Sequence, residues 1–556
     1  MNISDRFGYW RDVRGRGDVL LLGLATGLAV AGVYLGVELN RWSGNFYNAL
    51  QVLDADKTYA LLGNYLFLLA GIVVSRVAVT YLKECLALRW RVWLTGQMLG
   101  RWLNAGRHYR LEAMAGHDNP DQRVAEDAAL FSRGVLDTGF GLLSSLLSLL
   151  SFGVILWQLS ASMPLPGVGA SVPGYLVWAC VIYTLAGTLV THWLGAELVD
   201  IQFGIQRKEA EFRRVLLGQR AHAESISFQR AEQAEQVRAM ACMYEVAGVQ
   251  SARIRKEKSL GIFTITYGQV SALVPVFFAI PIFLSGKMQL GGLMQTSQAF
   301  VQVSMALSWF IFAYKDLAQL AATFRRLSGF GRALDEVQKN EVLPHACDEC
   351  LAFGGVVALP DGAKLAPLSL QVGLHERLWL QGPSGAGKTT LTRLLAGLWP
   401  LAAESSVCKP AGNGMFLPQN SHIAEGTLMA ALSYPRLPSV LMRDACQRVL
   451  CACGLANLVD CLDESTDWMR RLSGGEQQRF AFARLILHRP DWVVMDEPVN
   501  KLDDASARDL LAQLYRELPE LTSLTISHQS LPRMAYTRHM FWQLSTDKKE
   551  QIACPV

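Results

Sequence analysis

A glycine-rich loop in the C-terminal half carries the residue types of a phosphate-binding site. The apolar run LWLQ at 378–381 predicts a buried strand, which leads directly into GPSGAGKTT. Glycines let backbone N–H groups surround phosphate oxygens, Lys388 adds a positive charge for the β- and γ-phosphates, and the Thr389 hydroxyl suits Mg²⁺. The predicted nucleotide-binding residues of this loop are Gly382, Pro383, Ser384, Gly385, Ala386, Gly387, Lys388, Thr389 and Thr390.

Two adjacent carboxylates follow another apolar segment, DWVVMDEP, which predicts a second buried strand. Asp496 is suited to hold Mg²⁺ through water, and Glu497 is suited to polarise an attacking water as general base. An acidic pair standing alone would indicate only a solvated strand end. With a phosphate-binding loop earlier in the same chain, the pair predicts hydrolysis of a nucleoside triphosphate.

A third element, LSGGEQQR at 472–479, resembles the signature of ATP-binding cassette (ABC) proteins residue for residue. The resemblance implies that Ser473, Gly474 and Gly475 bind the γ-phosphate of an ATP held by the opposite subunit. We expect these residues to begin a helix, whose dipole favours an anion at its N-terminus. Gln477 completes the predicted ATP contacts of this segment.

Three further residues match motifs of the same family in the expected order. Gln419 in FLPQN matches a glutamine that senses Mg²⁺ and water, Asp503 in NKLDD matches the dimer-communication loop, and His528 in TISHQ matches the switch histidine that contacts the γ-phosphate. The resemblance implies ATP and Mg²⁺ as the bound groups. The predicted catalytic residues are Glu497, His528 and Gln419, the predicted Mg²⁺ ligands are Thr389, Gln419 and Asp496, and Asp503 joins the ATP contacts.

Parts of the cassette depart from the family pattern. Many cassettes stack adenine on an aromatic residue ahead of the lysine, but the corresponding stretch reads VVALPDG, which leaves Leu359 or Pro360 to pack on the base. The communication loop reads NKLD where SALD is common, and FLPQNSH stands where FLPQ is followed by Pro-Tyr. The missing aromatic residue predicts loose base selectivity, and the change to NKLD bears on coupling between nucleotide sites.

Upstream of the cassette, the chain is apolar enough to lie partly in lipid. Hydrophobic residues make up 51% and charged residues 18% of the 556 residues, and the charged share is below the usual quarter. A helix that spans the hydrocarbon layer needs about 20 mostly apolar residues. The segments that meet this requirement are 18–39, 60–82, 135–158, 174–195, 259–285 and 292–314, the last being the most polar.

Positive charge indicates which ends of the spans face the cytoplasm. Basic residues crowd the segments 83–110 and 207–256, whereas the segment 161–174 contains no charge. Both termini and the two basic segments are therefore predicted to be cytoplasmic. The basic segments look helical, which predicts helices that extend far out of the membrane, and solvated linkers are the alternative. The net charge of +4 does not indicate a nucleic-acid partner, and the cysteines are expected to be reduced thiols.

A set of motifs carries a second resemblance, which covers nearly the whole chain. The motifs are RWRVWLT (89–95), RWL (101–103), YRL (109–111), DNPDQR (118–123), EAEFRR (209–214), AESISF (223–228) and GGLMQTSQAF (291–300). They are similar to the SbmA/BacA-like membrane domain of YddA-like bacterial transporters and of the mycobacterial importer of cobalamin and hydrophilic solutes, and more distantly to peroxisomal ABC transporters of subfamily D. The resemblance implies a bacterial inner-membrane protein with six transmembrane helices of the ABC exporter type at 1–330, a linker at 331–350 and an α/β P-loop nucleotide-binding domain at 351–556.

The basic segments are expected to contain the coupling helices that touch the cassette. The candidate run consists of Asp118, Asn119, Pro120, Asp121, Gln122 and Arg123. A helix start capped by Asp118 or Asn119, with Pro120 in the first turn, is an alternative that is compatible with coupling.

Polar residues inside the last span indicate a path for cargo. Gln295, Gln298, Gln302 and Trp309 are spaced to share one face of that helix. They predict either a wet cavity for a hydrophilic cargo or hydrogen bonds between helices.

The chain carries one phosphate loop and one signature, whereas the nucleotide sandwich needs both from opposite subunits, so a homodimer is the simplest assembly. Relatives with this membrane domain imply uptake of hydrophilic solutes such as peptides or cobalamin-like molecules, although the sequence does not set the direction. The alternatives are export of a peptide, drug or lipid-like (acyl-CoA) compound, and an ATP-gated regulator without cargo. Intact Glu497 and His528 argue against a regulator because they retain the means of hydrolysis.

Overall fold

The chain forms two compact units. The first consists of Met1–Arg101 and Asp118–Arg332, and the second of Trp102–His117 and Ala333–Val556. The stretch 102–117 therefore belongs to the second unit, although it lies between two predicted membrane helices in the sequence. The computed structural model describes residues 8–11, 16–113, 119–160, 173–284, 286, 288–339, 345–347, 350–357, 368–383, 386–401, 405–436, 442–542 and 553–555.

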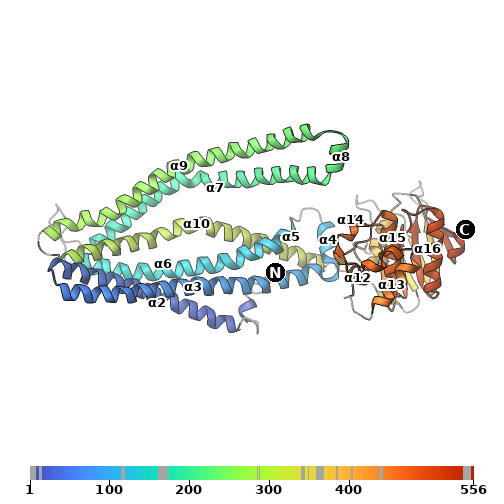
Figure 1. Cartoon of the computed structure of the whole chain (residues 1–556), viewed down its shortest axis with the longest axis horizontal. Coiled ribbons are helices and arrows are strands. Elements are labelled where there is room, and N and C mark those ends of the chain that lie inside the picture. Colours follow the sequence, from blue (N-terminus) through green and yellow to red (C-terminus); the bar gives the residue numbers. More distant parts are fainter. Residues whose placement is uncertain are drawn as a thin grey trace. The chain divides into compact units, whose positions relative to one another are not determined.

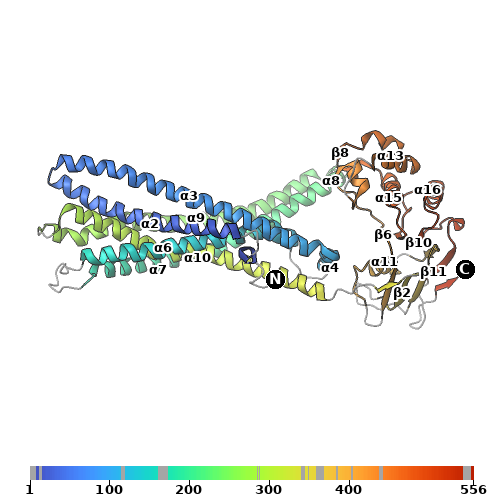
Figure 2. The same ribbon diagram turned by 90° about the horizontal axis from the view of Figure 1, so that it is seen from below.

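Long helices make up most of the first unit (Figure 1 and Figure 2). They are α2 (Arg16–Gln51), α3 (Ala55–Leu103), α6 (Ala128–Ser160), α7 (Tyr175–Ala221), α9 (Glu232–Leu284) and α10 (Leu290–Lys339). α7 and α9 run side by side as a hairpin, and the short α8 (Ala223–Phe228) closes its tip. Large apolar side chains such as Phe67, Ile182 and Phe277 are exposed along these helices, as lipid would accommodate.

Five of the described helical stretches are long and apolar enough to cross a membrane. They are Gly17–Gln51, Ala55–Glu112, Pro120–Ser160, Tyr175–Ala221 and Glu232–Ile280, and each overlaps one of the first five predicted spans. The predicted sixth span, 292–314, lies within helix α10 but does not belong to this set. Its glutamines and serines lower the hydropathy of the helix, so the sixth crossing stays a prediction.

Three helices are longer than a membrane crossing requires. α3, α7 and α9 contain 49, 47 and 53 residues. Each has more than twice the roughly 20 residues that cross the hydrocarbon layer. The basic segments 83–110 and 207–256 are therefore largely helical extensions of the spans, and the alternative of solvated linkers is wrong for them.

A buried ion-pair cluster joins the start of α6 to α10. The helix opens as α5 (Pro120–Gln122) and continues through η3 (Arg123–Asp127) into α6. The Asp127 carboxylate accepts hydrogen bonds from Arg123 Nη1 at 2.8 Å and from Arg326 Nε at 2.9 Å and Nη2 at 2.6 Å. Because Asp127 is 2% exposed, the two guanidinium groups balance a charge inside the bundle.

A six-stranded sheet with the order β12-β11-β4-β10-β9-β6 forms the centre of the second unit. Its strands are β4 (Arg377–Gln381), β6 (Gly414–Leu417), β9 (Trp492–Asp496), β10 (Thr522–Ser527), β11 (Arg538–Trp542) and β12 (Ala553–Pro555). Neighbouring strands are parallel except for the pair β11 and β12. A second sheet, with the order β1-β5-β2-β3, contains β1 (His345–Cys347), β2 (Cys350–Gly355), β3 (Leu368–Gly373) and β5 (Ser406–Pro410).

Both faces of the six-stranded sheet are covered and carry helices, which confirms the predicted α/β domain. One face packs its Val493 and Met495 against α12 (Leu428–Ser433), α13 (Arg443–Ala452), α15 (Gly474–His488) and α16 (Asp504–Glu517). The other face packs Val494 against α11 (Lys388–Ala396) and the second sheet. This alternation follows from the two-residue period of a strand, and apolar residues on both faces are typical of a buried parallel sheet.

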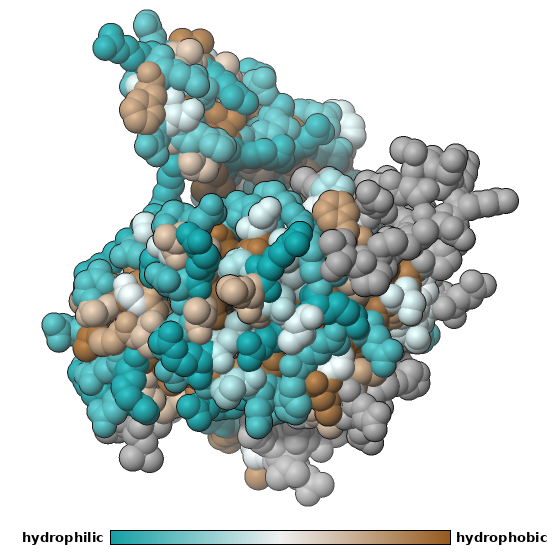
Figure 3. All heavy atoms as spheres, turned by 90° about the vertical axis from the view of Figure 1, so that its right-hand side faces the viewer, coloured by the Kyte–Doolittle hydropathy of each residue, from teal (hydrophilic) through white to brown (hydrophobic). Residues whose placement is uncertain are grey.

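The right-hand end of the molecule in Figure 1 faces the viewer in Figure 3, where most of the coloured surface is hydrophilic. Among the described cysteines, Cys180, Cys446 and Cys453 are buried free thiols, whereas Cys408 in β5 is disulfide-bonded. The expectation of reduced thiols is therefore wrong for Cys408.

Candidate functional site

Parallel strands deliver the predicted catalytic residues to one edge of the six-stranded sheet. β4, β10, β9 and β6 are neighbours that run in the same direction, with Ile526 opposite Asp496 in the register. Because the carboxyl ends of parallel strands meet at one edge, the residues that follow them converge. These residues are Gly382 after β4, His528 after β10, Glu497 after β9 and Gln419 after β6.

The phosphate loop connects β4 to α11, which begins at Lys388. Gly387 has a φ of 88°, a left-handed conformation that glycine adopts without strain. The Lys388 ammonium is buried and donates to the carbonyl oxygens of Gly382 at 2.7 Å and Pro383 at 2.6 Å. Of the other predicted loop residues, Ser384 and Gly385 lie outside the described residues, whereas Ala386, Thr389 and Thr390 are described.

Asp496 and Thr389 form an oxygen-rich group beside Lys388. Asp496 ends β9, is 3% exposed and shares a hydrogen bond with the Thr389 side chain. Burial raises the pKa of Asp496, and the Thr389 hydroxyl opposes this shift. Burial also lowers the pKa of Lys388, although the carboxylates of Glu497 and Asp496 oppose that change. A hydroxyl and a carboxylate are the hard oxygen donors that Mg²⁺ prefers, so these residues fit that ion.

Glu497 is the centre of the predicted catalytic group. Its carboxylate accepts hydrogen bonds from Gln419 Nε2 at 3.2 Å and Asn500 Nδ2 at 3.3 Å, and its Oε1 lies 2.6 Å from His528 Nδ1. The Glu497 side chain is 14% exposed, so it is held by neighbours and still open at the edge of the sheet. The three predicted catalytic residues therefore meet, and Asn500 joins them although sequence reasoning gave it no role.

The signature segment begins a helix, as predicted, with Ser473 as the N-cap of α15. The Glu476 N–H donates to Ser473 Oγ at 3.3 Å, and the Ser473 N–H donates to Glu476 Oε2 at 2.9 Å, which is a capping box. The bonds from Ser473 lower the pKa of Glu476. Gln477, which was predicted to contact ATP, donates from Nε2 to the carbonyl oxygens of Met469 at 2.8 Å and Leu472 at 3.0 Å.

The communication loop is tied to the signature helix. Asp503 caps α16 by accepting a hydrogen bond from the Ser506 N–H at 3.1 Å, and contacts with Ser506 lower the pKa of Asp503. The buried Gln478 donates to Asn500 Oδ1 and accepts from the Lys501 N–H at 2.9 Å. Sequence reasoning missed Gln478 and Asn500, and the departure NKLD was the available signal.

Comparisons with known proteins agree with this geometry. The sequence model described as ABC transporter transmembrane region 2 matches residues 14–284, and the one described as ABC transporter matches residues 365–500. The inner membrane ABC transporter ATP-binding protein YddA of Escherichia coli K12 is 33% identical over 528 residues, which cover 94% of this chain and 93% of YddA. The chain belongs to the ABC transporter family.

Other relatives of this ABC transporter are named as members of subfamily D. ABC transporter D family member 2, chloroplastic, of Arabidopsis thaliana is 28% identical over 92% of this chain and 81% of its own length. The lysosomal cobalamin transporter ABCD4 of Homo sapiens is 26% identical over 86% of this chain and 84% of its own length. A bacterial Atm1-family ABC exporter solved with ATP bound shares the fold, with a TM-score of 0.71, 18% identity and coverage of 95% of this chain and 93% of that chain. The transporter binds ATP and couples ATP hydrolysis to transport across a membrane.

A short segment from the membrane half of the ABC transporter packs within the second unit. It is α4 (Arg107–Ala113), together with the residues just before it. The Arg393 guanidinium of α11 lies 6.0 Å from the centre of the Tyr109 ring. Gly106 has a φ of 70°, and a Cβ there would lie 2.8 Å from Leu398 Cδ2. α4 therefore contacts the helix that follows the phosphate loop and the turn after it.

The predicted coupling run 118–123 belongs to the first unit. Asp118 lies outside the described residues. Pro120 occupies the first turn of α5, as the helix-start alternative predicted, but Asn119 has a φ of 33° and makes no side-chain cap hydrogen bond. Further along, Arg123 pairs with Asp127. The described part of the run is a helix start, and its coupling role stays a prediction.

Two of the predicted cavity residues contact α2. Gln298 Nε2 donates to Ser43 Oγ at 3.0 Å, and Asn40 Nδ2 donates to the carbonyl oxygen of Gln295 at 3.0 Å. Asn40 is 2% exposed, so these bonds lie inside the bundle. Gln298 therefore forms a hydrogen bond between helices, which was the alternative to a cavity for cargo.

The other two predicted cavity residues, Gln302 and Trp309, are half-buried. Trp309 lies against α6, where a Cβ on Gly141 would come within 2.8 Å of the indole Nε1. The role of Gln302 as a cargo contact stays a prediction.

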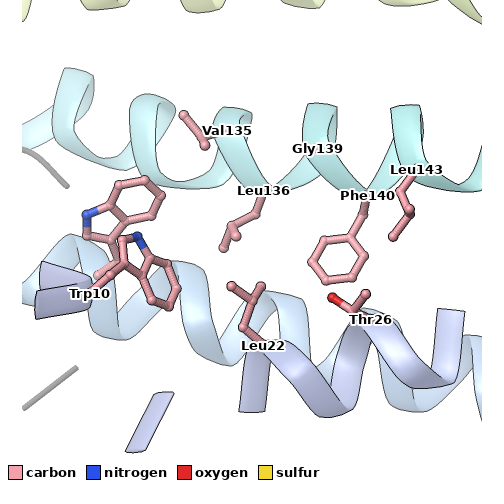
Figure 4. Close-up of a pocket in the computed structure, with 9 residues that line it drawn as sticks. Trp10, Leu22, Thr26, Val135, Leu136, Gly139, Phe140 and Leu143 are labelled. Atoms are coloured by element: carbon pink, nitrogen blue, oxygen red, sulfur yellow. The ribbon is translucent and has the colours of Figure 1, made fainter. Parts of the chain in front are cut away.

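An apolar pocket of about 280 Å³ lies between η1 (Gly8–Arg11), α2, α3 and α6. In Figure 4, Leu136 and Phe140 of α6 point toward Leu22 and Thr26 of α2, with Trp10 at one end. None of the predicted cavity residues lines this pocket. A polar cargo would lose its hydrogen bonds to water there with few replacements, so the pocket does not match the predicted path for a hydrophilic solute.

Proposed function

We propose that two copies of this chain form a transporter of the bacterial inner membrane that imports hydrophilic solutes such as peptides or cobalamin-like molecules. The observation that carries the cargo class is similarity over 86% of the chain to a relative named as a lysosomal cobalamin transporter. The name of YddA supports the inner membrane as the location. The basic segments between the spans favour cytoplasmic termini.

In the proposed ATP site, loop 382–390 surrounds the phosphates and Lys388 balances their charge. Segment 473–475 of a second copy contacts the γ-phosphate, and Glu497 orients the attacking water. Mg²⁺, when bound, compensates charge on the β- and γ-phosphates, and its proposed ligands are Thr389, Asp496 and Gln419. Because one chain supplies one loop and one signature, two copies complete two sites.

We propose α4 as a coupling element between hydrolysis and transport. Its support is that residues 102–117 belong to the same compact unit as the nucleotide-binding domain, with Tyr109 near Arg393 of α11. The run 119–123 then begins the next membrane helix, where Arg123 shares Asp127 with Arg326 of α10. In this proposal α6 and α10 respond together to a displacement of α4, because this ion pair joins them.

Transport into sealed vesicles of known orientation tests the direction and the cargo. Labelled peptide or cobalamin is offered outside right-side-out vesicles that contain ATP, and the Glu497→Gln variant serves as the control. Import predicts accumulation that depends on ATP and is absent from the control. Accumulation in inside-out vesicles with external ATP would instead establish export, and hydrolysis without movement of either compound would favour a regulator.

A further inference from the structure

The loop NKLD carries an amide where this family commonly has serine, and the amide reaches the proposed general base. Asn500 Nδ2 donates to Glu497 Oε2 at 3.3 Å. Its Oδ1 accepts a hydrogen bond from Gln478 Nε2. One side chain thus connects the carboxylate of Glu497 to the signature helix α15.

Gln478 fixes the loop on the side of the signature helix. Its side chain is buried, with 7% of the residue exposed, and its Oε1 accepts from the Lys501 N–H at 2.9 Å. The side-chain nitrogen and oxygen of Gln478 therefore form hydrogen bonds with two consecutive loop residues, Asn500 and Lys501. This pairing holds the loop at two points relative to the helix that Ser473 caps.

Other departures from the family pattern lie in the same place. Lys501 Nζ donates to Asn420 Oδ1 at 3.4 Å, and Asn420 stands where the family has proline after the glutamine. The preceding residue, Gln419, donates to Glu497 Oε2 at 3.2 Å. Of the residues that depart from the family pattern, Asn500 therefore contacts the Glu497 carboxylate, and Lys501 and Asn420 connect the two loops that carry Asn500 and Gln419.

We propose that Asn500 is a positioning residue for ATP hydrolysis, which orients the Glu497 carboxylate and ties it through Gln478 to the signature helix. The inference rests on the proposed role of Glu497 as general base. A carboxylate held by a fixed donor needs less reorientation to meet the attacking water. Since segment 473–475 serves the nucleotide of the other site, the same connection relates occupancy of one site to the geometry of the base in the other.

The test uses the full chain in lipid and the substitution Asn500→Asp. This change keeps the size of the side chain and the oxygen that faces Gln478, but it replaces the donor to Glu497 with a second carboxylate. We expect kcat for ATP hydrolysis to fall roughly ten- to hundredfold, the range for loss of one hydrogen bond to a charged group. KM and the equilibrium affinity for ATP should stay near their wild-type values.

A second measurement separates positioning from a general structural role. In the wild type the amide of residue 500 donates to the carboxylate of residue 497. When Glu497→Gln and Asn500→Asp are combined, the amide of residue 497 can donate to the carboxylate of residue 500 instead. Asn500→Asp should therefore lower Tm in the wild-type background and leave Tm unchanged in the Glu497→Gln background. A matched control is Gln513→Glu on α16, where Gln513 Nε2 donates to Glu517 Oε1 at 3.1 Å, and it should leave kcat unchanged.

Each outcome decides between the proposals. Full activity in Asn500→Asp, with turnover lost in Glu497→Gln, overturns the positioning role alone. An equal fall in kcat and ATP affinity, or a Tm loss that persists in the Glu497→Gln background, also overturns it. Turnover retained in Glu497→Gln overturns the proposed general base and the positioning role with it.

Discussion

Glu497 occupies a backbone conformation that few side chains adopt, with a φ of 48°. Such conformations cost roughly 1–3 kcal/mol and persist only where neighbouring structure holds them. Here the Glu497 N–H donates to the carbonyl oxygen of Ile526 at 2.8 Å, and the carboxylate is held by Gln419, Asn500 and His528. The strain and the hydrogen bonds together direct the carboxylate into the edge of the sheet where the phosphate loop lies.

Glu497→Gln should nearly abolish ATP turnover and leave ATP binding intact. The amide keeps the shape of the side chain but cannot accept a proton, so we expect a fall of roughly 10²- to 10⁴-fold in kcat. Phosphate release and equilibrium ATP binding measure the two properties separately. The exposed Glu520 offers a matched Glu→Gln control that should behave as wild type. Normal turnover in Glu497→Gln would remove Glu497 from its role.

Ser473→Ala should loosen the first turn of α15. The substitution removes the side-chain oxygen that accepts from the Glu476 N–H, and loss of such a cap costs about 1 kcal/mol. We expect faster hydrogen exchange of the amides in this turn, and Ser473→Thr should retain most of the protection because threonine also caps. Unchanged exchange in Ser473→Ala would contradict the importance of the capping box.

At the scale of elements, the proposed coupling element α4 lies in the stretch where the chain leaves the first unit and enters the second. α3 ends at Leu103, α4 follows at Arg107–Ala113, and the chain returns to the first unit at Asp118. Gly106 permits the tight turn before α4 because its φ of 70° is accessible to glycine. The turn therefore determines how α4 is presented to α11.

Gly106→Val should uncouple hydrolysis from transport. Valine is strained at this positive φ, which favours a change in the backbone that precedes α4, and its Cβ would lie 2.8 Å from Leu398 Cδ2, so that side chain must also move. We expect ATP hydrolysis to continue while vesicle uptake falls. Gly100→Val is the matched control, because nothing lies within 4 Å of a Cβ at Gly100. Uptake and hydrolysis reduced in the same proportion would argue against a coupling role for this turn.

Two glutamines on α10 should respond differently to alanine. Gln298→Ala removes the bond to Ser43 Oγ and should lower the thermal stability of the helix bundle, with an effect on uptake that follows from it. Gln302→Ala should leave stability unchanged and alter the KM for cargo uptake, if Gln302 lines the path. Unfolding temperature and uptake kinetics separate the two effects. A Gln302→Ala variant with normal uptake would exclude this residue from the path.

The difference between predicted and observed features follows from what local patterns encode. Lys388, Asp496 and Glu497 could be assigned from the sequence because the glycine-rich loop that leads to Lys388, and the acidic pair itself, each lie at the carboxyl end of an apolar strand. Asn500 could not, because its role depends on how the loop folds back onto Glu497 and meets Gln478. The sequence pattern of a polar helix face is likewise the same whether the face lines a water-filled cavity or forms hydrogen bonds with another helix, as Gln298 does. The unit to which 102–117 belongs depends on tertiary packing, which helix periodicity does not encode.

At the scale of the whole molecule, the chemistry calls for two chains. The hydrogen bonds described for Ser473 stay within the start of α15, while the phosphate loop lies between β4 and α11. The proposed site needs the signature of another copy to face that loop. We therefore expect ATP to favour association of two copies, since the nucleotide would lie between them and gain contacts from the second copy.

ATP should hold two copies together when hydrolysis is blocked. The Glu497→Gln variant in lipid nanodiscs is predicted to be dimeric in the presence of ATP, with cross-links between Ser473→Cys in one copy and Ser384→Cys in the other. Without ATP the cross-linking yield should be lower. A variant that stays monomeric with ATP would contradict the shared nucleotide site.

The α7–α9 hairpin has a mechanical consequence. α9 contains 53 residues, which corresponds to about 80 Å at 1.5 Å per residue. The hydrocarbon core accounts for roughly 30 Å of that length, so about 50 Å remains outside it. Over such a lever arm, a tilt of only about 5° displaces the tip at α8 by about 4 Å, the width of a side chain. Rotations of the membrane spans too small to open a visible gap would thus be amplified at the far end of the hairpin.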